Sequence, residues 1–367
     1  MSTARNWKIG REIGEAVIKA SRNPNRRWYG PHMAAAARAI SDRIPLVDFV
    51  LEIRDSRIPF SSEYELLRKF TAFSLRRIIV LNKMELADSF GLKESMDYFE
   101  RRNCPSYAVN SHNKECVKQF LNFLHSKVRE LHKSGHTNHT TTFMLLGIPN
   151  VGKSALANAL HQIGRISAAE KGKLKHTVVS SEPGNTKDIT SLKIGSRPNI
   201  YVLDTPGILP PNLQDAEICS KLALTGAIRD DLVGEIELAQ FFLTVLNSGH
   251  EYKRWAKLCK SEDETEHLNN GTPKLDTMNK RQYPTDHTQD FIVRDVRRVL
   301  YQTISAFDGN LEDEIDMENL VKSQFAALRT VLRVSAEAGE YADLIVASKL
   351  LNLYRTGRLG QYTLEHV

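Results

Sequence analysis

The chain has 367 residues, of which 41% are hydrophobic and 26% are charged, so it is long enough to bury the cores of two domains. It contains no run of about 18 apolar residues, which excludes a membrane-spanning helix and predicts a soluble protein. The four cysteines form no Cys-x-x-Cys pair, which argues against a zinc site and favours a reducing compartment, and the net charge of +6 alone is weak evidence for a nucleic-acid partner.

The first segment carries the whole surplus of positive charge. Residues 1–43 contain nine Lys or Arg and only three Asp or Glu. Because Trp7, Ile9 and Ile13 lie among the basic residues, the segment is similar to a mitochondrial presequence or to a basic arm that contacts RNA. A solvated, frayed terminus is the alternative interpretation. We predict a basic N-terminal arm over residues 1–34.

Residues 35–209 are predicted to form an α/β domain. Short apolar runs rich in β-type residues are each followed by a polar loop and a helical stretch, a pattern typical of a mostly parallel sheet with crossover helices. A helix is predicted over Lys114–His132 and a polar linker over Lys133–Thr141. The six predicted strands are Val47–Ile53, Arg77–Leu81, Ser106–Val109, Thr142–Leu146, Ser191–Ile194 and Ile200–Leu203.

Residues 210–367 are predicted to form a second, all-α domain. Apolar residues in this part recur at helical spacing, as an amphipathic helix requires. The stretch 261–287 is polar and contains Gly271, Pro273 and Pro284, so it is predicted to be an insertion loop. The predicted helices are Asp215–Arg229, Glu235–Leu246, Asp290–Ile304, Leu320–Ala336 and Tyr341–Tyr354.

A phosphate-binding loop is predicted between Leu146 and a helix over 155–161. Residues 147–154 match the pattern G-x-x-x-x-G-K-[ST], whose backbone N–H groups cradle the α- and β-phosphates of a nucleotide. In this pattern Lys153 would neutralise charge between the β- and γ-phosphates, and Ser154 would bind Mg²⁺. The predicted nucleotide contacts are Asn150, Val151, Gly152, Lys153, Ser154 and Ala155.

Two further segments match the switch regions of a GTPase. Asp204 and Gly207 belong to an Asp-Thr-Pro-Gly sequence at the end of a predicted strand, so Asp204 would hold Mg²⁺ through water and Gly207 would donate its N–H to the γ-phosphate. Between this sequence and the phosphate loop, Thr186 is the candidate hydroxyl that binds Mg²⁺ only when the γ-phosphate is present. Taken alone, the Pro-Gly-Asn-Thr around Thr186 is more often a simple turn.

The guanine base requires a loop of the form Asn-Lys-x-Asp, and this chain has Asn82-Lys83-Met84-Glu85 after a predicted strand. Glu85 keeps the charge of the usual Asp on a longer side chain. Since hydrogen-bonded base sites discriminate by up to about 10⁴ to 10⁵, a displaced carboxylate predicts a weakened preference for GTP over ATP. Asn110 and Ser111, at the end of the next strand, fit the second base-contacting loop.

The order of these motifs along the chain carries more information than each motif alone. The two base loops precede the phosphate loop and the switches, whereas an ordinary GTPase begins with the phosphate loop. With the Asp55-Ser56-Arg57 sequence after the first strand, the chain resembles the circularly permuted ribosome-assembly GTPases of the YlqF/RbgA type. Within that family it is most similar to the mitochondrial ribosome-associated GTPases, including the plant short-integuments kind.

The resemblance implies a mechanism for hydrolysis. Ile208 occupies the position of the water-orienting Gln of signalling GTPases, so His32 is implied as the residue that orients the attacking water. Asn150 is implied as a ligand of K⁺, whose charge would stabilise the developing negative charge. A helix-capping His32 and an ordinary turn residue at Asn150 are the alternatives. Asp55 and Arg57 are interpreted as a structural ion pair that braces the base loop.

The resemblance also implies the biological role. It predicts a GTP-hydrolysing assembly factor, binding GTP or GDP with Mg²⁺ and K⁺, for the large subunit of a mitochondrial ribosome and its rRNA on the matrix side. It further implies a monomer and peripheral association with an organelle inner membrane, with hydrolysis stimulated by K⁺ and by the ribosomal particle. An RNA-binding scaffold with a vestigial nucleotide site and a signalling or transport GTPase are the alternatives. Basic residues available for RNA phosphates are Arg294, Arg297, Arg298, Arg329, Arg333, Lys349, Arg355 and Arg358.

Overall fold

The computed structural model describes residues 7–22, 29, 31–70, 76–133, 140–167, 188–258, 286–335 and 341–365. The chain divides into two compact units. The sheet unit contains Met1–Ser2, Gly10–Val233 and Tyr362–Val367, and the helical unit contains Thr3–Ile9 and Gly234–Gln361. The domains predicted from the sequence divide the chain after residues 34 and 209 instead. The prediction placed the end of the chain in the helical domain, whereas Tyr362–Val367 belong to the sheet unit.

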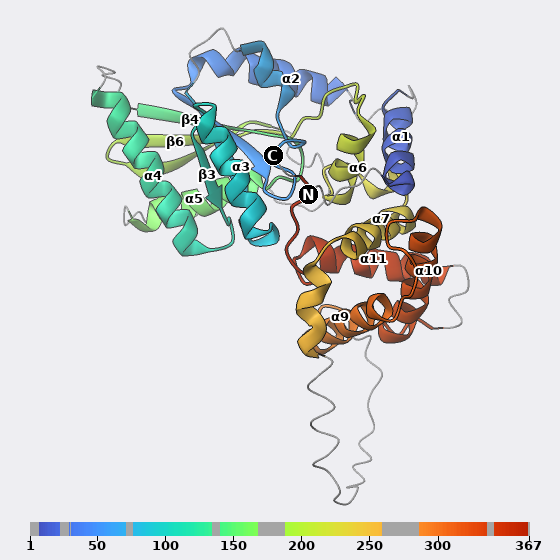
Figure 1. The fold of residues 1–367 in the computed structure, drawn as a ribbon. Helices are drawn as coiled ribbons and strands as arrows, with labels where there is room; N and C mark the ends of the chain where they lie inside the picture. Colours follow the sequence, from blue (N-terminus) through green and yellow to red (C-terminus); the bar gives the residue numbers. More distant parts are fainter. Residues whose placement is uncertain are drawn as a thin grey trace, which may run out of the picture. The chain divides into compact units, whose positions relative to one another are not determined.

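The sheet unit is built on six strands, all of which lie at the predicted positions. The strands are β1 Phe49–Asp55, β2 Arg77–Asn82, β3 Ser106–Val109, β4 Thr140–Leu146, β5 Thr190–Ser196 and β6 Asn199–Asp204. They form one sheet in the order β3-β2-β1-β4-β6-β5 (Figure 1). Only β5 runs antiparallel to its neighbour, so the predicted mostly parallel sheet is confirmed.

Helices cover both faces of this sheet. On one face, α2 (Pro31–Arg43) packs on Val50 and Met144, and α3 (Ser89–Arg101) packs on Ile79 of the adjacent strand. On the other face lie α4 (Lys114–Lys133) and α5 (Lys153–Ser167), which contact each other and β3 and β5 respectively. The strands are apolar on both sides because each face is covered, as expected for parallel sheets.

The described part of the basic N-terminal segment contains a packed helix. Helix α1 (Lys8–Arg22) buries Ile13 and Val17, and a side chain at Gly14 would lie 2.0 Å from the carbonyl oxygen of Ala216. Ala216 begins helix α6 (Ala216–Leu224), so α1 packs closely on the start of α6. The packed helix over Lys8–Arg22 disagrees with a solvated, frayed end, whereas the presequence and the basic arm stay predictions.

Helix α6 is shorter than the predicted helix that continues to Arg229. Its end is explained by Gly226, which has a φ of 80° that terminates the helix at little steric cost.

The helical unit contains α7 Glu235–Ser248, α9 Asp290–Ser305, α10 Glu314–Val331 and α11 Ala342–Arg355. Within it α7 packs on α11, and α9 packs on α10. Most of the predicted insertion 261–287 lies outside the described residues. Within the part of the chain that the structure describes, no helix is both long and apolar enough to cross a bilayer.

Candidate nucleotide site

The candidate site lies where the parallel strands end. Asp55 of β1 is paired in register with Asn82 of β2, which in turn is paired with Val109 of β3. On the other side of β1, Glu52 pairs with Leu146, the last residue of β4. Because the carboxyl ends of parallel strands meet at one edge, both base loops and the phosphate loop leave the sheet together.

The phosphate loop joins β4 to α5, as the sequence predicts. Gly152 has a φ of 89°, which favours glycine, and α5 begins at the next residue. Lys153 is only 5% exposed, and its Nζ donates to the carbonyl oxygens of Gly147 at 3.1 Å and Ile148 at 2.8 Å. Burial lowers the pKa of Lys153 to about 8, although the negative charge of Asp204 favours the protonated amine. Near neutral pH the amine therefore still carries its proton, although it holds that proton less tightly than an exposed lysine does.

The switch segment after β6 lies against the phosphate loop. A side chain added at Gly207 would lie 2.6 Å from Cα of Pro149 and 2.9 Å from Nζ of Lys153, so only glycine permits this approach. Thr205 donates its hydroxyl to the carbonyl oxygen of Leu145 at 2.5 Å, and Asp204 is fully buried. The structure thus brings Asp204 and Gly207 to the phosphate loop, whereas Thr186 lies outside the described residues.

The side chain of Asn82 joins the first base loop to the phosphate loop. Asn82 donates from Nδ2 to the carbonyl oxygen of Val151 at 2.8 Å and accepts at Oδ1 from the hydroxyl of Ser111 at 2.6 Å. One amide therefore joins the phosphate loop, the first base loop and the second base loop. Asn82, Ser111 and Lys153 belong to three motifs that are far apart in the sequence, yet they line one connected edge.

Glu85, which replaces the usual Asp, is the last residue of the first base loop. It belongs to a 3₁₀ turn, Met84–Leu86, and is partly buried. Burial raises the pKa of its carboxyl group, while the nearby charges of His112 and Lys83 lower it. Asn110 orders the second loop by accepting from the backbone N–H of His112 at 2.8 Å. The longer acid, which belongs to the first base loop, is therefore also near His112 of the second.

The Asp-x-Arg sequence forms a buried network beneath the base loop. Arg57 donates to both oxygens of Asp55, at 3.0 and 2.8 Å, and Lys83 donates to the same carboxylate at 3.0 Å. Burial would raise the pKa of Asp55, but the charges of Arg57 and Lys83 outweigh it and hold the pKa well below its usual range. The predicted bracing ion pair is present, and Lys83 completes it.

Ser56 was missed by the sequence analysis. Its backbone N–H and its hydroxyl both donate to the carbonyl oxygen of Asn82, at 2.9 and 2.7 Å. These two bonds hold the last residue of β2 in place from the neighbouring loop. No motif singles out this serine, because the variable position of an Asp-x-Arg sequence gives no indication of where its side chain will bond.

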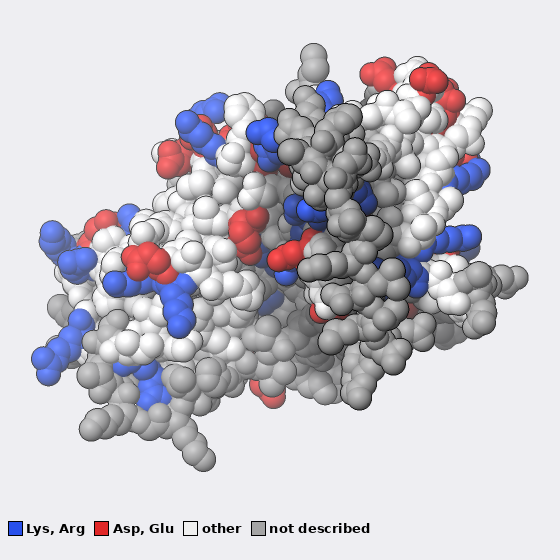
Figure 2. Space-filling model, turned by 90° about the horizontal axis from the view of Figure 1, so that it is seen from below, with Lys and Arg blue, Asp and Glu red and all other residues white. Residues whose placement is uncertain are grey.

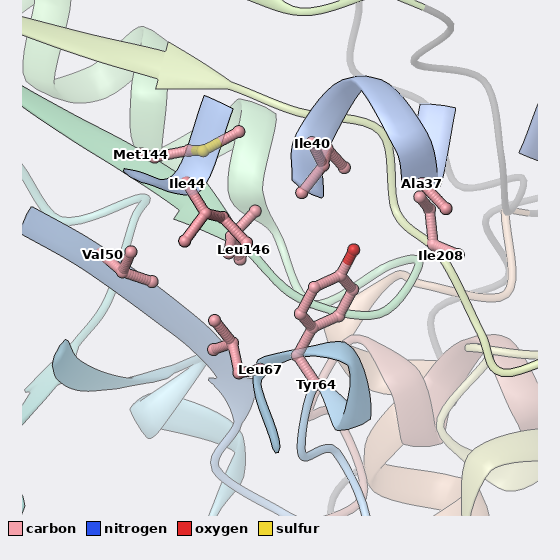
Figure 3. Close-up of a cluster of buried hydrophobic side chains, with 9 residues drawn as sticks. All are labelled: Ala37, Ile40, Ile44, Val50, Tyr64, Leu67, Met144, Leu146 and Ile208. Carbon is pink, nitrogen blue, oxygen red and sulfur yellow. The ribbon is translucent and has the colours of Figure 1, made fainter. Parts of the chain in front are cut away.

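The residues implied in hydrolysis occupy different environments. Ile208 is only 2% exposed and belongs to an apolar cluster with Ala37 and Ile40 of α2 (Figure 3). His32 is exposed on the first turn of the same helix. Asn150 has a φ of 59° and donates from Nδ2 to the carbonyl oxygen of Gly226 at 2.7 Å. Ile208 is therefore a core residue, and Asn150 joins the phosphate loop to the end of α6.

Several basic residues of the helical unit are already engaged. Arg329 pairs with Asp343 at 2.7 Å, Arg358 with Asp290 at 2.7 Å and Arg298 with Asp295 at 3.2 Å. On the face shown in Figure 2, basic and acidic side chains are interspersed. The arrangement of charge therefore does not by itself identify an RNA-binding surface.

Comparison with known proteins agrees with this geometry. Residues 142–280 match the family model described as 50S ribosome-binding GTPase. DAR GTPase 2, mitochondrial, from Arabidopsis thaliana is 78% identical over 100% of this chain and 97% of its own length. Short integuments 2, mitochondrial, from the same plant is 40% identical over 93% and 89%. Ribosome biogenesis GTPase A of Bacillus pumilus is 30% identical over 74% and 94%.

The similarity extends over nearly the whole chain, and the motifs converge at one edge of the sheet despite their permuted order. This chain therefore belongs to the family of circularly permuted GTPases that includes DAR GTPase 2, Short integuments 2 and ribosome biogenesis GTPase A.

Proposed function

We propose that this GTPase acts in assembly of the large subunit of the mitochondrial ribosome, on the matrix side of the organelle. The observation that carries the proposal is the near full-length similarity to two mitochondrial relatives and to a bacterial ribosome biogenesis GTPase. The partner is the large subunit with its rRNA. The protein acts as a monomer, with peripheral association with the inner membrane as a further expectation.

We assign the base and the phosphates of GTP to the two sides of the connected edge. Asn82, Lys83 and Glu85 face the base together with Asn110 and Ser111. The phosphates lie on the loop 147–154, where Lys153 is already buried with its amine directed at backbone carbonyls. A triphosphate offers Lys153 stronger acceptors than these carbonyls, because its oxygens carry negative charge and attract the protonated amine.

The donor set fits a Mg²⁺ ion beside the phosphates. The Asp204 carboxylate lies close enough to Lys153 to favour the protonated amine, and Ser154 is the next residue of α5. Carboxylate and hydroxyl oxygens are ligands that Mg²⁺ prefers, and Thr186 is assigned as a further ligand. The ion, when bound, neutralises charge on the β- and γ-phosphates. Gly207 donates its N–H to the γ-phosphate from its close position on the phosphate loop.

Asn150 is assigned to K⁺. Its amide nitrogen donates to the carbonyl oxygen of Gly226, which orients the side chain, and Oδ1 is the atom that we assign as the ligand. A monovalent cation bound at this point would supply the positive charge that an arginine supplies in other GTPases. Faster turnover in K⁺ than in Na⁺ would support this assignment, and equal rates would favour the purely structural bond to Gly226.

His32 is assigned to the water-orienting role because Ile208 cannot perform it. Ile208 is an apolar side chain with its surface almost entirely buried among other apolar residues. His32 belongs to α2, the helix that Ile208 contacts through Ala37 and Ile40, so movement of the switch can be passed to the helix that carries His32. His32→Ala should reduce stimulated turnover and leave nucleotide affinity unchanged, with His287→Ala as the control.

The direct test of function combines binding and turnover. The purified protein is sedimented with mitochondrial large subunits in the presence of a non-hydrolysable GTP analogue or of GDP, and its GTPase rate is measured with and without the subunits. We expect co-sedimentation with the analogue and a faster rate with subunits. Co-sedimentation without any acceleration would favour an RNA-binding scaffold, whereas neither effect would favour a signalling or transport GTPase.

A further inference from the structure

The last described residues of the chain belong to the sheet unit and bond to residues that are far away in sequence. We call Tyr362–Glu365 the C-terminal staple. All four of its residues are buried, with exposed fractions between 3% and 7%. The staple follows the whole helical unit in the chain and belongs to the same compact unit as the nucleotide site.

The backbone of the staple joins two loops of the candidate site. The N–H of Tyr362 donates to the carbonyl oxygen of Leu86 at 2.9 Å, at the end of the 3₁₀ turn that contains Glu85. Two residues later, the N–H of Leu364 donates to the carbonyl oxygen of Arg57 at 2.8 Å. The staple therefore bonds both to the base loop and to the Asp-x-Arg loop that braces it.

The side chains of the staple add to these bonds. Glu365 accepts from the backbone N–H groups of Phe60 at 2.7 Å and Ser61 at 3.1 Å, and also from the Ser61 hydroxyl. Lys221 of α6 lies 3.6 Å from the same carboxylate. Thr363 packs on Gly91 of α3, where an added side chain would lie 2.9 Å from it. A buried carboxylate with this many donors is well compensated and fixed in one position.

We propose that the C-terminal staple is a positioning element for guanine recognition. It touches the base loop on the side of Leu86, while Ser56 and Asn82 hold the start of that loop. The short turn that carries Glu85 is thus fixed at both ends. Recognition by hydrogen bonds requires accurate placement of the acid, and a longer acid than usual makes its backbone position more important.

The inference rests on the assignment of the base loop made above and predicts a specific defect. Releasing the staple should loosen contacts to the base and leave contacts to the phosphates intact. The affinity for GDP should therefore fall while the affinity for ADP, which lacks the guanine contacts, stays the same. A staple that only stabilises the fold would lower the melting temperature and leave the ratio of the two affinities unchanged.

The test compares two truncations of the full chain by fluorescence titration with labelled GDP and ADP. One variant ends after Gln361 and loses the staple, and the matched control ends after Glu365 and keeps it. We expect the first to bind GDP about tenfold more weakly, which corresponds to about 1.4 kcal/mol, with ADP affinity within about twofold of wild type. The control should match the wild type for both nucleotides.

A point variant covers the case in which the truncated chain does not fold. Glu365→Gln keeps the size of the side chain and removes its charge, and we expect at least about threefold weaker GDP binding with unchanged ADP binding. Equal losses for both nucleotides, or no loss for either, would overturn the proposal. A wild-type protein that binds GDP and ADP equally would instead refute the assignment of the base loop.

Discussion

The two units of the molecule differ in what they bury. The helical unit buries only neutral polar side chains among its described residues, chiefly the amides of Asn247 and Gln324, which bond to each other at 3.0 and 2.8 Å. The sheet unit, by contrast, contains every buried charged side chain that the described residues include. These are Glu52, Arg54, Asp55, Arg57, Lys153, Asp204, Lys221 and Glu365.

The difference indicates where function constrains the chain. Burying a charge is costly unless it is paired and hydrogen-bonded. A protein in which apolar side chains replace a buried ion pair is often as stable as one that keeps the pair. Several buried charges of the sheet unit nevertheless lie at one edge, around the loops assigned to GTP. The helical unit, whose described core is mainly apolar, shows no such concentration and is stabilised as an ordinary helical domain.

The largest effect should come from the buried charge nearest to the phosphates. Lys153→Ala removes the amine assigned to the β- and γ-phosphates, so the rate of GTP hydrolysis should fall by about 1,000-fold, the upper range for loss of one electrostatic contact. Single-turnover hydrolysis measures it. Lys127→Ala, which removes a lysine paired with Glu130 on α4, is the control and should hydrolyse GTP at the wild-type rate. Equal hydrolysis rates for the two variants would show that Lys153 does not contribute to GTP hydrolysis.

The next effect concerns the charged network beneath the base loop. Asp55→Asn leaves Arg57 and Lys83 buried close together without their shared carboxylate, so the sheet unit should lose about 3 kcal/mol of unfolding free energy. Hydrogen exchange of the β1 and β2 amides in denaturant measures this loss. Asp231→Asn breaks an exposed pair with Arg229, and its cost should stay below about 1 kcal/mol. Similar losses of unfolding free energy for the two variants would show that burial does not determine how much these charges contribute to stability.

The helical unit offers the neutral counterpart of that experiment. Asn247→Ala leaves the buried amide of Gln324 without this partner, so the unfolding free energy of the helical unit should fall by about 2 kcal/mol. Hydrogen exchange of the α7 and α10 amides measures this loss. Replacing both amides by leucine should recover most of that loss, because no polar group then remains unsatisfied. Neither variant should alter GDP affinity. A change in affinity would mean that the two units are coupled through this pair.

The smallest effect is a pH dependence of nucleotide binding. The pKa of Lys153 is about 8, and bound phosphate favours the charged amine, so binding above that pH requires uptake of a proton. Affinity for GDP should therefore decrease as pH rises, by about tenfold between pH 7 and pH 9. Calorimetry in buffers of different ionisation enthalpy would detect the proton uptake. Affinity that is constant over this range would show that the amine is already charged in the free protein.

The strands and the phosphate loop could be predicted because their patterns are local. Each strand is a short apolar run, such as Ile78 to Leu81, and the glycines and lysine of 147–154 appear in a fixed spacing. Helix α6 was predicted too long because the conformation of Gly226, which ends it, is not evident from composition. Helix α1 was missed as a packed element, since its buried face depends on Gly14 fitting against α6.

The connections between motifs could not be predicted in the same way. The hydroxyl of Ser56 and the carboxylate of Glu365 act on residues placed near them only by the tertiary fold, and Glu365 bonds to Ser61 across 304 positions of sequence. A four-residue extended segment has no periodicity that distinguishes it from a loose tail. The sequence therefore predicts which side chains meet the nucleotide better than it predicts what holds them in place.

The central claim is that loops in permuted order form one guanine-nucleotide site. A crystal structure of the protein with Mg²⁺ and a non-hydrolysable GTP analogue tests it most directly. We expect a single nucleotide whose phosphates contact Lys153 and Gly207 and whose base lies between Asn82, Glu85 and Ser111. A nucleotide whose base lies away from Glu85 and Ser111, or whose phosphates bind elsewhere, would contradict the account.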